Sequence, residues 1–320
     1  MVQAPQDAEW DILILGGGPA GLTAGLYAAR GAMRTLLIER LVAGGQAATT
    51  EWVENYPGFP EGISGVELSQ RMEEQAIRFG LKTSREEATA LKVLDGEPGS
   101  FEVATDQGVH RSLSVIIAMG ADYARLGVPG EEEFRGRGVS YCATCDGPFF
   151  RDQEVLVVGG GDSAVEEGIY LTKYASKVTV VHRRDRLRAS PVIQGRAFAN
   201  PKMEFLWNSV VEAIEGDQGV ERVRLRDLRT GRTWERQCSG VFMFVGTVPN
   251  TQFLRGVVEM DERGYIVTDE EMMTSVRGVF ACGDARRKLL RQVVTACGEG
   301  ATAAFAAQRY VEELRGTSYK

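Results

Sequence analysis

Short apolar runs that lead directly into glycines recur along this chain and dominate its pattern of hydrophobic and polar positions. Ile12–Leu15 leads into Gly16, and Val155–Val158 leads into Gly159. A continuous apolar run of this length is typical of a strand buried on both faces of a parallel sheet. Each glycine loop is followed by a helix-like stretch and a second apolar run, namely Leu22–Arg30 with Thr35–Ile38, and Ala164–Tyr174 with Val178–Val181. The pattern predicts two strand–helix–strand units and an α/β fold.

The glycines between strand and helix have the spacing of a dinucleotide-binding loop. In the first loop Gly16 permits a tight turn, Gly18 lets the backbone approach a pyrophosphate, and Gly21 lets helix and strand pack closely. The N-terminus of the helix then faces the phosphate charge. The remaining predicted loop positions are Pro19, Ala20, Gly159, Gly161, Asp162, Ser163 and Ala164. The sequence therefore predicts two Rossmann-like nucleotide sites.

The residue at the end of the second strand differs between the two units. In the first unit it is Glu39, which is placed to accept hydrogen bonds from ribose hydroxyls. In the second unit the equivalent position is His182, followed by Arg183 and Arg184, with Arg188 close downstream. Cations suit a 2′-phosphate, which a carboxylate would repel. We therefore expect FAD in the first site and NADPH in the second.

A further strand is predicted near the C-terminus. Val279–Ala281 is apolar and leads to Gly283 and Asp284, and a helix rich in small residues is predicted over 295–308. An acid at the tip of a strand, with a helix N-terminus beyond it, is suited to hold a ribityl chain and the edge of a flavin ring. Taken alone, a Gly-Asp pair is more often only a turn.

The order of these units predicts how the domains are arranged. Two apolar runs, Ile116–Gly120 and Val241–Gly246, lead into segments that we expect to cross between domains. Residues 1–118 and 247–320 would then form a discontinuous FAD-binding domain, and residues 119–246 an inserted NADPH-binding domain. A chain of 320 residues has room for about two domains.

Composition narrows the functional classes further. No apolar run approaches the roughly 18 residues of a membrane span, and Met1–Trp10 lacks the basic-then-apolar order of a signal peptide. The net charge of −7 gives no overall field that favours nucleic acid. Only His110 and His182 occur, which argues against a hydrolytic triad or a multi-histidine metal site. The arginines at 222, 224 and 226 alternate with apolar residues and are expected on the water-facing side of a strand. We expect a cytoplasmic protein that acts on neither membranes nor nucleic acid.

Two cysteines are spaced as a pair just before the second glycine loop. Cys142 and Cys145 are separated by two residues, and Asp146 follows directly. In a redox pair of this spacing one thiol stabilises the thiolate of the other, and a mixed disulfide can be resolved within the pair. Asp146 could move protons as the thiols change state. The alternative is a zinc site, but Cys238 and the other cysteines are isolated and no histidine is near them in sequence. We expect no metal.

With these motifs in place, the sequence closely resembles the low-molecular-weight thioredoxin reductases over nearly its whole length. The residues that carry the resemblance are Gly16–Gly21, Gly44–Gln46, Val53–Gly58, Cys142–Asp146, Gly159–Ala164, His182–Arg184, Gly283–Asp284 and Arg291–Gln292. The resemblance adds Gly45, Gln46, Asn55, Arg291 and Gln292 to the expected FAD site.

The resemblance also implies a mechanism. It implies a homodimer with tightly bound FAD, in which electrons pass from NADPH through FAD to the Cys142–Cys145 disulfide and on to thioredoxin. Cys145 would face the flavin, Cys142 would exchange with thioredoxin, and Asp146 would be the acid–base residue. It further implies a domain rotation, because dithiol and nicotinamide need the same face of the flavin.

Two residues depart from the family pattern, and two other functions stay open. Met119 stands where the family usually has threonine, and Cys282 stands where a small residue is commoner; we interpret Cys282 as a buried, inert thiol. The same scaffold could serve a ferredoxin or flavodoxin reductase, which would not need the cysteine pair, or the reductase of a peroxiredoxin system. A zinc-stabilised nucleotide sensor without turnover belongs to a different class. Bound flavin would favour the enzyme, and bound zinc the sensor.

Overall fold

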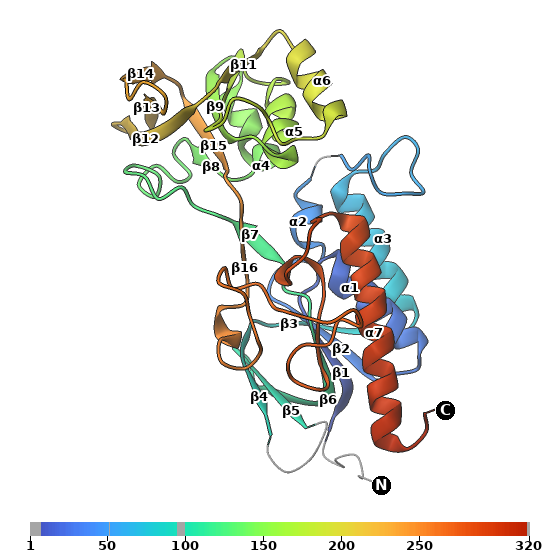
Figure 1. Cartoon of the computed structure of the whole chain (residues 1–320). Helices are drawn as coiled ribbons and strands as arrows, with labels where there is room; N and C mark the ends of the chain where they lie inside the picture. Colours follow the sequence, from blue (N-terminus) through green and yellow to red (C-terminus); the bar gives the residue numbers. More distant parts are fainter. Residues whose placement is uncertain (1–7, 51, 95–99, 319–320) are drawn as a thin grey trace. The chain divides into compact units, whose positions relative to one another are not determined.

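A computed structural model describes residues 8–50, 52–94 and 100–318, and Figure 1 shows the order of its elements. The chain divides into two units, the first made of Met1–Asp122 with Val248–Lys320 and the second of Tyr123–Thr247. The expected boundaries at 118/119 and 246/247 lie within a few residues of these divisions. The prediction about a signal sequence rested on residues 1–10, of which 1–7 lie outside the described residues.

A largely parallel sheet forms the centre of the first unit. Its strand order is β3-β2-β1-β6-β5-β4, and β17 is a further neighbour of β6. The strands around β1 pair in parallel, whereas β4 and β5 extend the sheet in the antiparallel sense. The strands are β1 Trp10–Leu15, β2 Thr35–Glu39, β3 Lys82–Arg85, β4 Ala88–Val93, β5 Phe101–Thr105, β6 Val109–Ile117 and β17 Val279–Ala281. Ile12–Leu15 are completely buried, as the apolar run predicted.

Helices α1, α3 and α7 lie alongside one another in this unit (Figure 1). The helical segments are α1 Pro19–Arg30, α2 Gly45–Ala48, α3 Gly65–Arg78, η2 Gln252–Leu254, η3 Gly283–Ala285 and α7 Val293–Arg315. A Cβ placed on Gly300 of α7 would lie 2.2 Å from the carbonyl oxygen of Ala20 in α1, so the backbones of the two helices approach each other closely. α7 is longer than the predicted 295–308. Tyr310 and Val311 extend its buried face, and Gly316 ends it in the left-handed conformation.

The second unit has its own parallel sheet in the order β11-β10-β9-β15-β8. Its strands are β8 Val139–Ser140, β9 Glu154–Gly159, β10 Lys177–Val181, β11 Met203–Leu206 and β15 Gly240–Phe244, and its helical segments are α4 Ala143–Asp146, η1 Gly147–Phe150, α5 Asp162–Leu171 and α6 Pro191–Ala199. α5 ends before the predicted 174. The Thr172 hydroxyl donates to the carbonyl of Ile169 at 2.6 Å, and the chain turns there. Both units therefore have the predicted strand–helix–strand core, and the α/β fold class is confirmed.

A three-stranded antiparallel sheet accompanies this core, formed by β12 Ser209–Gly216, β13 Val220–Asp227 and β14 Thr233–Gln237. On β13, Val223 and Leu225 are completely buried. The arginines that alternate with them form ion pairs on the other face, Arg224 with Glu215 at 3.1 Å and Arg226 with Glu212 at 2.7 Å. The predicted water-facing position of these arginines is confirmed.

The two segments that cross between the units pair with each other. β7 (Ala121–Tyr123) and β16 (Thr247–Pro249) form a two-stranded sheet. The amide of Ala124 donates to Gly246 O at 2.9 Å, and the amide of Asn250 donates to Gly120 O at 3.1 Å. Both glycines have positive φ, 64° at Gly120 and 134° at Gly246, which other residues rarely adopt.

No helix within the described ranges is both long and apolar enough to cross a bilayer.

The close approach of α1 and α7 makes a matched pair of substitutions informative. Gly300→Ala places a methyl group 2.2 Å from Ala20 O, whereas a Cβ on Gly298, two residues earlier, meets nothing within 4 Å. We expect Gly300→Ala to lower the free energy of unfolding by about 1–3 kcal/mol through overpacking. Gly298→Ala should raise it by up to about 1 kcal/mol through helix propensity. Urea unfolding of both variants measures this, and equal stabilities would contradict the packing described.

A buried carboxylate joins the outer strands of the first sheet. Glu86, only 8% exposed, accepts hydrogen bonds from Ser84 at 2.5 Å and Thr105 at 2.6 Å, and lies 2.9 Å from His110 Nε2. Burial opposes ionisation of Glu86, but these three partners outweigh it and lower its pKa to about 2. His110, one of the two histidines, therefore serves a structural network here.

This network should make stability depend on pH. Because the pKa of Glu86 is lower in the folded state, its contribution is present above the unfolded value and is lost as pH falls towards about 2. We expect Glu86→Gln to be less stable than the unchanged protein by about 2–3 kcal/mol at pH 7. The difference should shrink steadily below about pH 4.5. Urea unfolding between pH 7 and pH 3.5 measures it, and a pH-independent difference would contradict the assignment.

Candidate functional sites

The first glycine loop is shaped by close backbone contacts. Gly16 has a φ of 105°, and a Cβ on it would lie 2.5 Å from Ala118 O. A Cβ on Gly21 would lie 1.8 Å from Gly16 O, so helix and strand can meet only without a side chain. At Gly18 a Cβ would meet nothing within 4 Å. The fold itself thus requires glycine at 16 and 21, whereas at 18 it leaves an open space in front of the helix.

That open space lies at the N-terminus of α1. Gly18 is the N-cap and gives no side-chain hydrogen bond, and Pro19 occupies the first turn. The first amides of the helix therefore have no side-chain cap, which is the arrangement that binds phosphate groups. A Cβ on Gly45 would come within 3.3 Å of Gly18 Cα, so the Gly44–Gln46 segment borders the same space.

Glu39, expected at the ribose, is already engaged with the loop. Its Oε2 accepts a hydrogen bond from the amide of Gly17 at 2.7 Å, and its Oε1 accepts one from the amide of Leu41 at 2.9 Å. Each carboxylate oxygen retains a further lone pair for a ribose hydroxyl. Gln46 directly follows Gly45, and its Nε2 donates a hydrogen bond to Asp122 Oδ1 at 3.3 Å.

Residues distant in sequence come together at the start of α7. The Asn55 amide donates to Gln292 Oε1 at 3.0 Å, although 237 residues separate them. Gln292 is also the N-cap of α7, in a capping box with Thr295. A Cβ on Gly283, which has a φ of 71°, would lie 2.8 Å from the Cβ of Ala20. The predicted Gly283-Asp284 segment therefore lies beside the N-terminus of α1.

Charged side chains around Asp284 form a cluster that sequence reasoning only partly found. Lys288 Nζ lies 3.1 Å from Glu299 Oε2 and 3.7 Å from Asp284 Oδ1, with the lysine side chain 4% exposed. Arg286 pairs with the other oxygen of Glu299 at 2.9 Å. Burial raises the pKa of Asp284. Lys288, Arg286 and Glu299 gave no sequence signal, because only the fold brings this loop onto α7.

Three buried polar atoms of this region form no hydrogen bond with any described residue. They are Asp284 Oδ1, Lys288 Nζ and Arg291 Nε, although Lys288 forms the ion pairs with Asp284 and Glu299 given above. The Arg291 guanidinium lies over the ring of Tyr265 at 4.2 Å, which fixes its position. A buried acceptor and a buried donor without partners fit a bound polar molecule. Together with the uncapped helix and the open space at Gly18, these residues fit a flavin dinucleotide.

The second glycine loop repeats the arrangement of the first. Gly159 has a φ of 154°, and a Cβ on it would lie 2.5 Å from Phe244 O and 2.7 Å from the Cβ of Ala164. Gly161 is the N-cap of α5 without a side-chain hydrogen bond, and a Cβ on it would meet only Arg188 Nη2 at 3.7 Å. Asp162, at the first turn of α5, accepts a hydrogen bond from Ser190 N at 2.7 Å. Asp162 thus holds the following helix as well as bordering the loop, while Ser163 is exposed.

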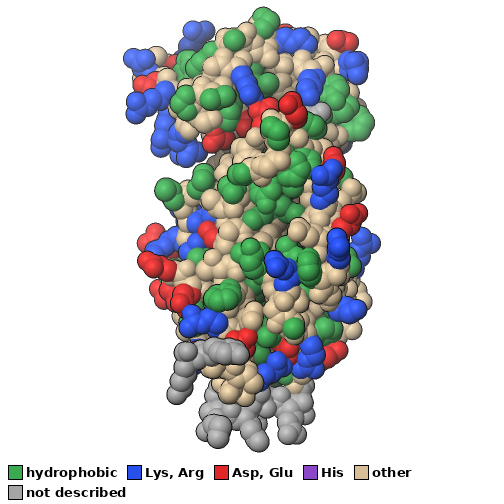
Figure 2. Space-filling view, turned by 90° about the vertical axis from the view of Figure 1, so that its right-hand side faces the viewer, with side chains coloured by type: hydrophobic (Ala, Val, Ile, Leu, Met, Phe, Trp, Pro, Cys, Tyr) green, Lys and Arg blue, Asp and Glu red, His purple; other side chains and the backbone are tan. Residues whose placement is uncertain are grey.

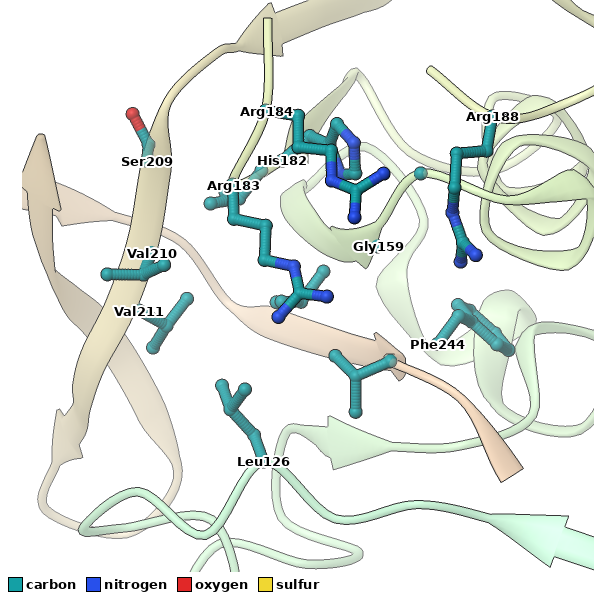
Figure 3. Close-up of a pocket in the computed structure, with 14 residues that line it drawn as sticks. Leu126, Gly159, His182, Arg183, Arg184, Arg188, Ser209, Val210, Val211 and Phe244 are labelled. Atoms are coloured by element: carbon teal, nitrogen blue, oxygen red, sulfur yellow. The ribbon is translucent and has the colours of Figure 1, made fainter. Parts of the chain in front are cut away.

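A pocket opens beside this loop, with about 620 Å³ of empty space that is partly open to solvent. Arg183, Arg184 and Arg188 line it, and Figure 3 shows their guanidinium groups extending around the same space. None of the three forms an ion pair with a described carboxylate. Leu126 and Val210 line the side of the pocket opposite Arg188 (Figure 3). Three unpaired cations beside an uncapped helix fit a phosphate-bearing nucleotide.

His182 also lines this pocket, but it is buried. The residue is only 6% exposed, and a Cβ on Gly160 would lie 2.3 Å from its Nδ1. Burial lowers the pKa of His182, with the charges of Arg188 and Arg184 acting in the same direction. The imidazole is therefore neutral near pH 7 and packs beneath the glycine loop. The expected positive charge at this position comes from the arginines alone.

Cys142 and Cys145 form a disulfide, with their Cα atoms 5.3 Å apart. Cys142 is the N-cap of α4, and its Sγ accepts the amide of Cys145 at 3.2 Å. The hydroxyl oxygen of Ser140 accepts a hydrogen bond from the amide of Cys142 at 3.1 Å, which fixes the turn before the cysteine pair. Cys145 is exposed and Cys142 half-buried, with Asp146 half-buried beside them. The amide donor at Cys142 Sγ would stabilise a thiolate there once the bond opens.

The other cysteines are inert by comparison. Cys238, Cys282 and Cys297 are free and buried. Burial raises the pKa of Cys238 to about 12 and raises that of Cys282 as well. Cys282, a departure from the family pattern, is completely buried, as the interpretation of an inert thiol expects. The described residues include no group of three or more Cys, His, Asp or Glu arranged to hold a metal ion.

Comparisons with known proteins agree on one family. The family model described as pyridine nucleotide-disulphide oxidoreductase matches residues 10–300. Thioredoxin reductase of Bacillus subtilis is 50% identical over 313 residues, which cover 98% of both chains. The crystal structure of Lactococcus lactis thioredoxin reductase, described as the FR conformation, is 45% identical and superposes with a TM-score of 0.93, covering 95% of this chain and 100% of that one.

A second solved structure is similar in sequence but not in superposition. Thioredoxin reductase of Streptococcus pyogenes is 48% identical, covers 95% of this chain and 98% of its own, and has a TM-score of 0.63. The two relatives are therefore similarly identical to this chain in sequence, but their structures superpose on it to very different extents.

The two nucleotide-loop units and the disulfide are those of a pyridine nucleotide-disulphide oxidoreductase. Within that class, the chain belongs to the thioredoxin reductase family.

Proposed function

We propose that this protein is an NADPH-dependent thioredoxin-disulfide reductase, with FAD bound in its first unit. The observation that carries the proposal is the Cys142–Cys145 disulfide in the same unit as the arginine-lined pocket. Membership of the thioredoxin reductase family supports it. A disulfide of this spacing, next to a nucleotide site, is suited to exchange electrons with a second protein.

The first unit offers the groups that would hold FAD. The open space at Gly18 and the uncapped amides of α1 would receive the pyrophosphate, and Glu39 the adenosine ribose. Asp284 and Arg291 supply a buried acceptor and a buried donor that form no hydrogen bond with the described residues. The other residues that we propose to contact FAD are Gly16, Pro19, Ala20, Gly21, Gly45, Gln46, Asn55, Gly283 and Gln292. When bound, FAD would supply the two-electron chemistry that links hydride donation to disulfide reduction.

The second unit offers the groups that would hold NADPH. The loop of Gly159, Gly161 and Ala164 would face the pyrophosphate at the start of α5. Arg183, Arg184 and Arg188 would surround the 2′-phosphate, which distinguishes NADPH from NADH. His182, being neutral, would support Gly160 from beneath and leave the phosphate to the arginines.

The cysteine pair would carry the electrons to thioredoxin. Two electrons and two protons convert the disulfide into two thiols. The Cys142 thiolate, stabilised by the amide of Cys145, attacks one sulfur of the thioredoxin disulfide and displaces the other, which takes up a proton. The Cys145 thiolate then attacks Cys142 Sγ, so the internal disulfide forms again and thioredoxin leaves with two thiols. Asp146 is the nearest carboxylate in sequence and would deliver and accept the protons.

A rotation between the two units would allow both half-reactions. The crossing strands β7 and β16 pair with each other and are flanked by Gly120 and Gly246, whose positive φ values mark points where the backbone can turn. The difference between the two solved relatives supports more than one arrangement of this fold. We propose that the crossing strands act as the hinge.

Protein partners fit the surface of the chain. Phe149, four residues after Cys145, is 76% exposed, which suits docking of a protein substrate beside the disulfide.

Large apolar side chains are also exposed in the first unit, among them Leu41, Val42 and Leu289, and Figure 2 shows hydrophobic side chains gathered on one face of that unit. Exposed apolar surface of this kind supports the proposed homodimer. We place the reaction in the cytoplasm, where thioredoxin disulfides are reduced.

Cofactor preference tests the arginine pocket. We expect the protein to prefer NADPH to NADH, and Arg183→Ala with Arg184→Ala to lower kcat/KM for NADPH roughly tenfold or more, since a charge-assisted phosphate contact contributes about 1.5–3 kcal/mol. Use of NADH should change little. Arg186→Ala is the matched control, because Arg186 is exposed in the same loop but does not line the pocket. Equal use of both cofactors by the unchanged protein would contradict the assignment.

The electron path is tested at the cysteine pair. We expect Cys145→Ser to retain FAD and to reduce ferricyanide with NADPH, because that route bypasses the disulfide. Thioredoxin reduction should be lost. The measurement is NADPH oxidation with thioredoxin and a disulfide acceptor, beside ferricyanide and ferredoxin as alternative acceptors. Thioredoxin reduction at the normal rate by the variant, or a preference of the unchanged protein for ferredoxin, would show that the proposed function is wrong.

A further inference from the structure

A buried carboxylate lies between the nucleotide pocket and the disulfide, and neither site uses it directly. Glu131 is 3% exposed. It has no lysine or arginine partner among the described residues, although burying an unpaired carboxylate is costly. Its charge is instead satisfied by three donors, the amides of Leu126 and Gly127 and the hydroxyl of Tyr141. These donors come from two segments that serve different sites.

The first segment forms a wall of the nucleotide pocket. Leu126 lines the pocket together with Arg183 and Val210 (Figure 3). Its amide donates to Glu131 Oε1 at 2.9 Å, and the next amide, that of Gly127, donates to Oε2 at 2.5 Å. Gly127 has a φ of 77°, so the chain makes a left-handed turn at this point. The carboxylate therefore fixes the backbone that presents Leu126 to the pocket.

The second segment precedes the disulfide. The Tyr141 hydroxyl donates to Glu131 Oε1 at 2.6 Å, and the residue after Tyr141 is Cys142. Burial and the neighbouring Glu131 carboxylate raise the pKa of Tyr141, so it remains a neutral donor at physiological pH. The Arg135 guanidinium lies over the tyrosine ring at 5.8 Å. Glu131 Oε1 thus accepts two hydrogen bonds. One comes from the amide of Leu126 in the pocket wall, and the other comes from the hydroxyl of Tyr141, the residue next to the attacking cysteine.

The neighbouring acid provides a contrast. Glu132 has a side chain 64% exposed and pairs with Arg125, and with Arg135 at 3.8 Å. It forms a surface ion pair, which contributes little to stability. Two adjacent glutamates therefore have different tasks, one buried and bridging two sites, the other exposed.

We propose that Glu131 is a positioning residue that couples the nucleotide pocket to the Cys142–Cys145 pair. This inference rests on the proposed function. A nucleotide that packs against Leu126 acts on the same oxygen that orients Tyr141, so occupancy of the pocket changes how Cys142 is presented. Coupling between two sites is reciprocal, so the state of the cysteine turn should also change nucleotide affinity.

Substitution by glutamine should break this bridge. A carboxamide keeps one acceptor oxygen but puts an NH₂ group where the second oxygen stood. The carboxamide in Glu131→Gln has two orientations. In one orientation its NH₂ group faces the donating amide of Gly127, and in the other it faces the two donors at the first oxygen, the amide of Leu126 and the hydroxyl of Tyr141. Tyr141→Phe removes one of the three donors and leaves both amides in place. Glu132→Gln is the matched control.

The test uses holoenzyme reduced with dithiothreitol and freed of reductant. Adenosine 2′,5′-bisphosphate is the probe of the pocket, with its Kd measured by calorimetry, and the alkylation rate of the cysteine pair by iodoacetamide is followed by mass spectrometry with and without the probe. In the unchanged protein the probe should alter the alkylation rate. In Glu131→Gln the Kd should rise about tenfold, as for loss of a hydrogen bond to a charged group, and the effect of the probe on alkylation should largely vanish.

The two supporting variants sharpen the outcome. Tyr141→Phe, altered only beside the cysteines, should also weaken probe binding, which a purely local role would not cause. Glu132→Gln should behave like the unchanged protein in both measurements. If the probe changes alkylation equally in Glu131→Gln and the unchanged protein, or changes it in neither, the coupling is overturned. If the unchanged protein does not bind the probe and does not reduce thioredoxin, the proposed function fails as well, so the two failures can be told apart.

Discussion

The structure depends on backbone contacts so close that no side chain fits between them. In the first unit the helix after β1 reaches the strand because Gly21 lies against Gly16 O, at a distance that a Cβ would reduce to 1.8 Å. In the second unit Gly159, the counterpart of Gly16, is similarly close to Phe244 O and to the Cβ of Ala164. These contacts bring each helix N-terminus to the edge of its sheet, where its amides face an open space. That placement suits the binding of nucleotides, because uncapped amides and phosphate charge are complementary.

The two sites differ in how they complete this common frame. Around the first, the fold gathers Asp284, Lys288, Glu299 and Arg291 from a loop and a helix far along the chain. Their charges are largely paired with one another, and among the described residues Asp284 Oδ1, Lys288 Nζ and Arg291 Nε form no hydrogen bond there. Around the second, Arg183, Arg184 and Arg188 form no ion pair with any carboxylate in the described part of the chain, so they remain available to a ligand. A site with internally balanced charge suits a permanently held group, and a site with unpaired cations suits an anionic ligand that enters and leaves.

Much of this could be predicted from the sequence. The fold class could be predicted from the apolar runs at β1, β2, β9 and β10 and from the glycine spacing. A continuous apolar run is typical of a parallel strand buried on both faces, and the glycine positions are fixed because no side chain fits there. The cysteine pair and the cluster of positive charge could also be predicted, because the residues of each lie close together in the sequence. These residues are Cys142 and Cys145, and Arg183, Arg184 and Arg188. The ends of the helices were predicted less accurately. α5 ends where the Thr172 hydroxyl bonds to the carbonyl of Ile169, and α7 ends at Gly316 in the left-handed conformation.

What the sequence determined by itself was therefore local: strands, loops, a dithiol and a cationic turn, each encoded within a few residues. Only the tertiary structure decided which distant groups meet. It joined Asn55 to Gln292, placed Lys288 on Glu299, and buried His182 beneath Gly160, so that a residue expected to be a cation is neutral. It also placed Glu131 between Leu126 and Tyr141. The physical reason is that burial and charge pairing depend on neighbours in space, and no pattern along the chain records which neighbours the fold will supply.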